Sequence, residues 1–214
     1  MPRRPFASAV ALAAIVPAIA LPSAASAAEI TGSDHGERLL GTRLSDTITA
    51  LAGRDHVLAR AGDDRVDGGA GADLLRGNLG DDAIDGGPGR DFVSGGFGDD
   101  RLSGGPGADR VMANKGVDTV DGGDGNDDLW ALSRKDVSGP GDTIGDTLIG
   151  GAGNDRFHTY DGEADRISCG DGRDRVIADT VDVIADATPE NPNGSCERVT
   201  RTTPESDARE NAAD

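Results

Sequence analysis

Aspartates recur every nine residues through the middle of this 214-residue chain, and no other set of side chains is so regularly placed to do chemistry. An aliphatic residue follows each aspartate two positions later, and a glycine-rich stretch precedes most of them. The register is unbroken over Asp46, Asp55, Asp64, Asp73, Asp82, Asp91, Asp100, Asp109, Asp118 and Asp127. A fixed short period predicts a solenoid whose repeats pack on their neighbours. Acidic, glycine-rich turns indicate a site for calcium.

Each nonapeptide divides into a six-residue turn and a three-residue strand. Side chains alternate along a strand, so the aliphatic residue faces a core while its neighbours face outwards. In the turn, glycines allow backbone angles that direct carbonyl oxygens toward a common point. Carboxylate and carbonyl oxygens suit calcium, and the turns offer no soft ligand for zinc or copper.

A coil made of two nonapeptides would stack aspartates eighteen residues apart on the same edge of the solenoid. One edge would then hold Asp64, Asp82, Asp100 and Asp118, and the other Asp55, Asp73, Asp91, Asp109 and Asp127.

Composition alone would predict disorder, because the formal net charge is -18 and aromatic residues make up only 3% of the chain. The repeat overrides that interpretation, since it places one aliphatic residue per nonapeptide into a single narrow core. So thin a core does not by itself offset the conformational entropy that is lost when the chain is ordered. A bound cation would supply the additional stabilisation. The acidic surface disfavours nucleic acid and anionic membranes as partners.

The first 28 residues have the pattern of a secretory signal peptide. Arg3 and Arg4 precede an apolar run over residues 9–21, and small residues at 25–27 offer a cleavage site. A membrane anchor would need about 20 apolar residues, so no membrane span is predicted. The protein is therefore expected to be secreted and extracellular, beginning near residue 29.

The remaining chain divides at changes in the repeat. We expect an N-terminal lead-in at 29–40, the repeat array at 41–177 with an insertion at 131–140, a C-terminal cap at 178–199 and a disordered tail at 200–214. A cap is expected because a solenoid must cover its last apolar layer and its open strand edges.

Cys169 and Cys196 form an even pair in a chain expected to be exported, which favours a disulfide. The alternative, a catalytic or metal-binding thiol, lacks a histidine at ligand spacing. His35, His56 and His158 show no zinc-site spacing and are interpreted as surface residues.

Three blocks carry a specific resemblance. Residues 68–75, 95–102 and 122–129 resemble the hemolysin-type, or RTX, calcium-binding nonapeptide. The ends around Cys169 and at 196–199 are similar to those of small exported calcium-binding proteins of actinobacterial type. The resemblance implies an all-β fold, a right-handed parallel β-roll (β-solenoid) of nonapeptide repeats, here with a disulfide-clamped C-terminal cap. It also implies several calcium ions, held between successive turns on each edge.

The metal ligands that follow from this resemblance are carboxylates and turn carbonyls. The carboxylates are those of Asp64, Asp73, Asp82, Asp91, Asp100, Asp109, Asp118, Asp127 and Asp155. The carbonyls lie around Gly69, Gly71, Gly87, Gly89, Gly96, Gly98, Gly105, Gly107, Gly123 and Gly125.

The sequence favours a secreted calcium-binding protein that folds on binding Ca²⁺ and acts as an extracellular structural or binding module. An alternative is an adhesin, or a partner-docking or self-associating protein, that uses an apolar outer sheet face formed by Leu74, Phe92, Met112 and Trp130. A secreted enzyme is disfavoured, because the sequence contains no Gly-x-Ser-x-Gly elbow and no phosphate-binding loop.

Overall fold

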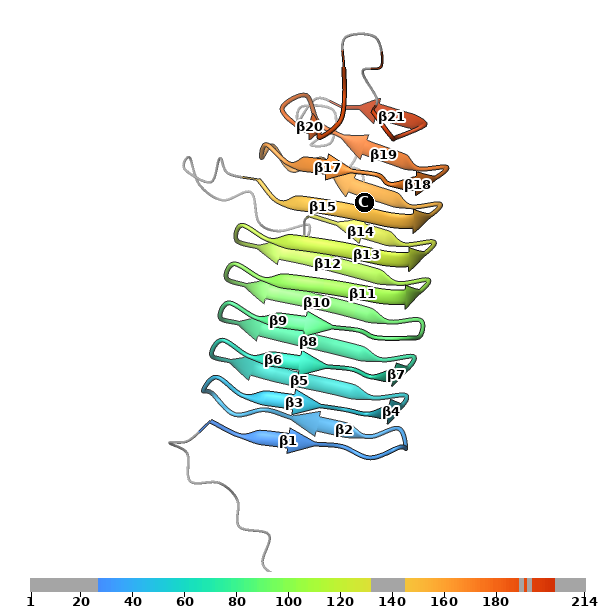
Figure 1. The fold of residues 1–214 in the computed structure, drawn as a ribbon. Helices are drawn as coiled ribbons and strands as arrows, with labels where there is room; N and C mark the ends of the chain where they lie inside the picture. The colour runs from blue at the N-terminus through green and yellow to red at the C-terminus, as the bar shows by residue number, and fades with distance from the viewer. Residues whose placement is uncertain (1–26, 132–144, 189–190, 192–193, 203–214) are drawn as a thin grey trace, which may run out of the picture.

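The computed structural model describes residues 27–131, 145–188, 191 and 194–202, and within them the chain is a parallel β-solenoid of about eight turns with no helix. Two sheets run the length of the stack, with the N-terminal coil at one end and the C-terminal coil at the other (Figure 1). The predicted signal peptide, insertion and tail fall almost entirely outside the described residues.

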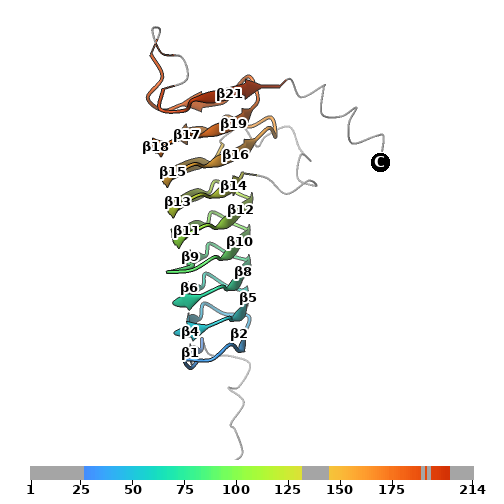
Figure 2. The same cartoon turned by 90° about the vertical axis from the view of Figure 1, so that its right-hand side faces the viewer.

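Both sheets consist of parallel strands, and the chain alternates between them. Sheet A contains, in spatial order, β1 (Glu29–Thr31), β3 (Thr47–Thr49), β6 (Arg65–Asp67), β9 (Ala83–Asp85), β11 (Arg101–Gly107), β13 (Thr119–Gly125), β15 (Thr147–Gly153), β17 (Arg166–Ser168) and β20 (Val183–Ile184), with β18 (Asp171–Gly172) beside β15. Sheet B contains β2 (Arg38–Leu40), β5 (His56–Ala61), β8 (Leu74–Leu79), β10 (Phe92–Phe97), β12 (Arg110–Lys115), β14 (Asp128–Trp130), β16 (Arg156–Thr159), β19 (Arg175–Ala178) and β21 (Arg198–Arg201). Figure 2 shows the two sheets edge-on, facing each other across a narrow interior.

The aliphatic residue of each nonapeptide forms the core, as predicted. In sheet A, Ile48 pairs in register with Val66 and Val66 with Ile84. In sheet B, Leu75 pairs with Val93 and Val93 with Val111 in the same way. All of these side chains are at most 3% exposed. The core is therefore one layer of aliphatic residues from each sheet, which is as thin as the composition requires.

Several strands are longer than the three residues expected for each repeat. β9 has three residues, but β10 has six and β13 has seven, because pairing continues into the glycine turns. Two further strands, β4 (Ala52–Gly53) and β7 (Ala70–Gly71), pair with each other within such turns, and Gly71 also bridges to Gly89 of the next coil. Adjacent turns thus stack closely enough for their backbones to hydrogen-bond.

Both ends of the array continue the two sheets. β1 and β2 lie in the segment expected to be a lead-in, and they pair with β3 and β5. β20 and β21 lie largely in the segment expected to be a cap, and they pair in parallel with β17 and β19. A disulfide joins Cys169 to Cys196, as predicted, and both cysteines are buried in the core. The capping role of this last coil stays a prediction, as does the right-handed sense of the coil.

The outer face of sheet B carries the four apolar residues singled out in the sequence, in two separate rows. Leu74 is paired with Phe92 in one row, and Met112 with Trp130 in the other. All four are half-buried. The ring of Trp130 is stacked on that of His158, with centroids 3.7 Å apart. This face therefore presents two apolar pairs, the second of them partly covered by a histidine.

In the described residues, no helix has the length and apolar character needed to cross a membrane.

Candidate metal centre

The aspartates form two ladders, one along each edge of the solenoid. In each ladder, the backbone N–H of one aspartate donates to Oδ1 of the aspartate one coil further along the chain. The N–H of Asp82 donates to Asp100 over 2.8 Å, and that of Asp91 donates to Asp109 over 2.7 Å. This arrangement confirms that one coil takes two nonapeptides. It also shows that alternate aspartates share an edge.

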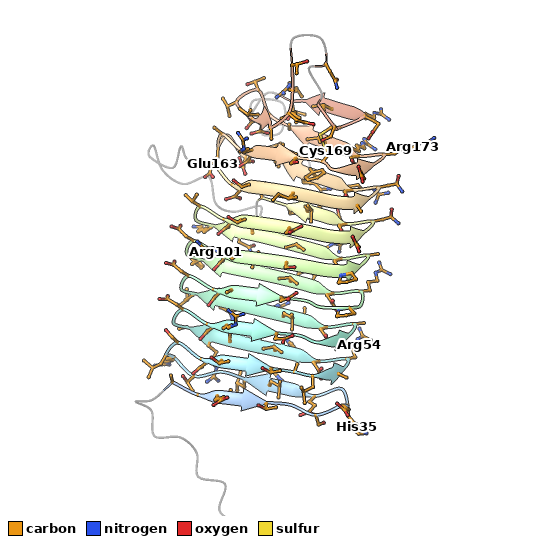
Figure 3. All side chains as sticks on the ribbon, in the orientation of Figure 1. His35, Arg54, Arg101, Glu163, Cys169 and Arg173 are labelled. Carbon is orange, nitrogen blue, oxygen red and sulfur yellow. A yellow bond between two sulfur atoms is a disulfide. The ribbon has the colours of Figure 1, made fainter. Side chains whose placement is uncertain are left out.

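The two ladders run nearly the whole length of the described chain. One contains Asp46, Asp64, Asp82, Asp100, Asp118, Asp146, Asp165 and Asp182. The other contains Asp55, Asp73, Asp91, Asp109, Asp127, Asp155 and Asp174 and ends at Glu197. In the orientation of Figure 3, the first ladder follows the edge near the labelled Glu163, and the second follows the edge near the labelled Arg54 and Arg173.

The second carboxylate oxygen of most ladder residues has no hydrogen-bond partner in the part of the chain that the structure describes. These side chains are at most 3% exposed, so the oxygen is also withdrawn from water. A buried polar atom without a partner normally costs about 1–3 kcal/mol. The unpartnered Oδ2 atoms belong to Asp55, Asp64, Asp73, Asp82, Asp91, Asp100, Asp109, Asp118, Asp127, Asp155, Asp165 and Asp174.

Glycines make room for these oxygens. A Cβ at Gly95 would lie 2.1 Å from Oδ2 of Asp100, and one at Gly77 would lie 2.0 Å from Oδ2 of Asp82. At these two turns the first glycine therefore leaves room for the ladder carboxylate, and a side chain there would require the carboxylate to shift.

Later glycines of the turn admit a carbonyl from the preceding coil. A Cβ at Gly125 would lie 1.3 Å from the carbonyl oxygen of Gly107. A Cβ at Gly98 would lie 2.4 Å from the carbonyl oxygen of Gly80. Carbonyl oxygens of stacked turns thus crowd the same edges as the carboxylates, and their role as ligands stays a prediction.

Burial makes the charged form of these carboxylates unfavourable. Loss of water raises the pKa of Asp100 to about 8, with further repulsion from Asp118 and Asp82, while the N–H of Asp82 opposes the rise. The same main cause, burial, raises the pKa of Asp82, Asp91 and Asp127 to about 7. When they are ionised, the aspartates of each ladder are a row of poorly solvated, mutually repelling carboxylates.

A hard divalent cation fits this donor set. The buried Oδ2 atoms supply negative charge that no described group neutralises by a hydrogen bond, and the stacked turns add neutral oxygens. Calcium prefers six to eight oxygen ligands and tolerates irregular geometry. The ladder aspartates and turn carbonyls would hold it, and its positive charge would offset their repulsion.

The structure places all nine predicted carboxylate ligands in the ladders and extends the set at the C-terminal end. Asp146, Asp165, Asp174 and Asp182 also belong to the ladders, although the nine-residue spacing is interrupted before Asp146, Asp165 and Asp182. A signal for them does exist, because each is followed two residues later by an aliphatic residue: Leu148, Ile167, Val176 and Ile184.

The first position of one ladder differs from the rest. Thr42 replaces a turn glycine, and its N–H donates to Oδ2 of Asp46 over 2.5 Å. The side chain of Asp46 therefore has partners for both oxygens, and it was also outside the set of ligands predicted from the sequence.

A second, exposed ladder accompanies the first edge and runs in the opposite sense. The N–H of Asp81 donates to Oδ1 of Asp63, and that of Asp99 donates to Oδ1 of Asp81. On the other edge, the corresponding turn positions include the exposed Arg54 and Arg90. The two edges therefore differ in charge outside the buried aspartates.

Comparison with known proteins bears on the same residues. A family model described as the RTX calcium-binding nonapeptide repeat matches residues 40–75, 67–102, 76–111, 103–133 and 140–176. No curated protein matches the chain. The matched ranges span most of both ladders and more than half of the chain. The chain belongs to the family of RTX calcium-binding nonapeptide repeat proteins, whose repeats bind several calcium ions per repeat domain.

Proposed function

We propose that this protein is a secreted calcium-binding protein whose β-roll folds on binding Ca²⁺ and which acts outside the cell as a structural or binding module. The observation that carries the proposal is the row of buried carboxylate oxygens without hydrogen-bond partners along both edges. Without a cation, these groups oppose the packing of one coil on the next. With one, they become ligands.

The proposed ligands are the nine carboxylates predicted from the sequence, together with the glycine carbonyls of the stacked turns. Asp55 and Asp174 join them, because their Oδ2 atoms are equally buried and equally without partners. Neutral carbonyls supply the remaining oxygens. Sites of this kind in extracellular modules bind calcium with a Kd of about 0.1–1 mM.

Calcium binding would stabilise the folded state of this protein. Each coil buries few apolar side chains, so the hydrophobic contribution per coil is small. Metal binding that occurs only in the folded state adds its free energy directly to folding. The proposed module is therefore ordered where calcium is abundant and unfolded where calcium is scarce.

Secretion is supported by the signal-peptide pattern of residues 1–28 and by the disulfide between Cys169 and Cys196, a bond typical of oxidising compartments. We propose no catalytic role, since the ladders and core account for the repeated residues and the family fold is a structural calcium-binding one.

Circular dichroism of the mature chain tests this function. In EGTA we expect the spectrum of an unfolded chain, and on titration with calcium a cooperative gain of β-structure. Magnesium serves as the control, because it demands a tighter octahedral geometry than irregular turns supply. A chain that is equally ordered in EGTA and in calcium would refute the proposal.

A further inference from the structure

The turn before β17 differs in kind from the turns that precede it on the same edge. It contains Asp161, Glu163 and Asp165 at alternate positions: Asp165 is the ladder aspartate, and Asp161 and Glu163 stand where turns such as 95–100 have glycines. One carboxylate oxygen from each of the three lies within 4.8 Å of the other two. Glu163 is labelled in Figure 3 at this edge, at the level of the C-terminal coils.

The turn is not stacked on its neighbour as the glycine turns are. Gly162 has a φ of +97°, yet a Cβ added there would meet nothing within 4 Å. At Gly98 of the same edge, an added Cβ would strike the carbonyl of Gly80. Carbonyls from the preceding coil therefore do not crowd Gly162 as they crowd Gly98.

Asp165 supplies an independent sign of a missing ligand. Its side chain is fully buried, and its Oδ1 accepts the N–H of Asp146 over 2.7 Å. Its Oδ2 has no hydrogen-bond partner among the described residues. The carboxylate that carries this unpartnered oxygen thus lies beside those of Asp161 and Glu163.

The following residues hold the turn in place through further carboxylates. Oδ2 of Asp179 accepts the N–H of Gly162 over 2.7 Å. Asp182 accepts the N–H of Asp165 and, through its other oxygen, the hydroxyl of Thr159. The repulsion of Asp161, Asp182 and Glu163 acts on Asp165. This concentration of negative charge is tolerable when a cation lies within it.

We propose that Asp161, Glu163 and Asp165 form a separate cation site, built from side-chain carboxylates of a single turn and selective for calcium or a trivalent lanthanide. Three carboxylates give this site more negative charge than a ladder site with its neutral carbonyls, so it binds calcium more tightly. Because Asp179 and Asp182 hold the same turn, occupation of the site also orders the final coil. The site is independent of the proposed ladder sites and could exist without them.

Terbium luminescence in the full chain tests this site selectively. Terbium takes the oxygen ligands of calcium, and Tyr160, the single tyrosine of the chain, is adjacent to Asp161. In a Trp130→Phe background, energy transfer to terbium must come from tyrosine. We expect terbium emission at low metal concentration that calcium displaces, and that Tyr160→Phe abolishes.

Glu163→Gln is the main variant, because this side chain is only half-buried and the change preserves its shape. We expect it to weaken the tyrosine-sensitised site by about tenfold or more. Asp161→Asn should act in the same direction. Asp171→Asn is the matched control, since it removes an exposed charge two strands away and should leave the emission unchanged.

The outcome is separable from that of the ladder proposal. Equilibrium dialysis should show Glu163→Gln losing one tight ion per chain while the calcium-dependent circular dichroism of the array persists. Loss of the ladder sites would instead leave the tyrosine-sensitised emission in place. Unchanged terbium emission and unchanged ion number in both Glu163→Gln and Asp161→Asn would overturn the inference.

Discussion

The backbone N–H of Asp82 donates to Oδ1 of Asp100 over 2.8 Å, while Oδ2 of Asp100 has no hydrogen-bond partner in the described chain. One oxygen of this carboxylate joins two coils, and the other is available to a metal ion. The same side chain therefore contributes to the fold by two routes that can be separated by substitution.

Asp100→Asn should have opposite effects with and without calcium. Asparagine keeps the Oδ1 acceptor for Asp82 and removes the charge. In calcium at about 10–100 times Kd, we expect the free energy of unfolding to fall by about 1–3 kcal/mol through lost binding. In EGTA, the variant should retain at least as much β-structure as the parent, because a buried ionisable group is gone. Urea unfolding in calcium and circular dichroism in EGTA measure this, with the exposed Asp121→Asn as control. A variant that also loses β-structure in EGTA would show that its loss of stability does not come from metal binding.

Acid should partly replace calcium. Burial raises the pKa of Asp100 to about 8 and that of Asp82 and Asp91 to about 7 in the folded chain, against 3.8 for an ordinary aspartate. A pKa raised by folding stabilises the fold fully below the ordinary value, and this stabilisation is lost as pH rises through the folded values. In EGTA, we therefore expect more β-structure at pH 5.5 than at pH 8.5. When calcium is limiting, the pH dependence of β-structure is reversed. Protons compete with calcium for the carboxylates, so the calcium concentration at which half of the chains are folded rises as pH falls. A metal-free chain that is more ordered at pH 8.5 would contradict the assignment of buried, unpaired carboxylates.

Two glycine substitutions separate the energetic cost of pushing the coils apart from the cost of a strained backbone angle. Gly125→Ala places a Cβ 1.3 Å from the carbonyl oxygen of Gly107 at a φ of +146°, so coil spacing must change. Gly162→Ala also requires a positive φ, but its Cβ meets no atom within 4 Å, and it should cost about 1–3 kcal/mol. We expect Gly125→Ala to cost more and to raise the calcium midpoint, as measured by circular dichroism. Equal costs would mean that the turns can separate freely.

The buried aliphatic residues of the core give a prediction that does not depend on metal binding. Leu129 is completely buried, and Leu129→Ala should destabilise the calcium-bound protein by about 2–5 kcal/mol. Ile149, on the outer face of β15, is 37% exposed, and Ile149→Ala should change stability by less than about 1 kcal/mol. Denaturant unfolding in saturating calcium compares the two. Similar losses would argue against the assigned register.

Reduction of the Cys169–Cys196 disulfide should release the last coil first. The bond closes a loop across 27 residues and contributes about 2–4 kcal/mol in small exported proteins. Hydrogen exchange in calcium, with and without reductant, should show faster exchange in β19 and β21 while β8 to β12 stay protected. Uniform protection after reduction would show that the disulfide does not hold this coil.

Much of the fold could be predicted because nine-residue spacing fixes geometry directly. An aspartate and an aliphatic residue two positions later specify a turn and an inward side chain, and alternation between two edges follows from the period. The first coil was harder to recognise, for a physical reason. The N–H groups of Ala28 and Glu37 donate to Asp46 and Asp55, and any residue other than proline could provide such a donor. The coil therefore needs no aspartate of its own, and the sequence of residues 29–40 carries no ladder signal.

The C-terminal sites were obscured by changes of spacing. An insertion separates Asp118 from its ladder partner Asp146 by 28 residues, and the next step to Asp165 takes 19. Side-chain placement around Asp161 and Glu163 depends on the stacking of the last coils, which a local sequence pattern does not specify.

The buried ladders give the stack a direction. Every buried ladder aspartate accepts an N–H of the coil that precedes it in the chain, so the ladder donors of each coil are satisfied only by the coil that follows. The two ends of the stack are therefore not equivalent: the N-terminal coil only donates to the ladders, and the C-terminal coil only accepts. Asp182 and Glu197 close the two rows by accepting the N–H groups of Asp165 and Asp174.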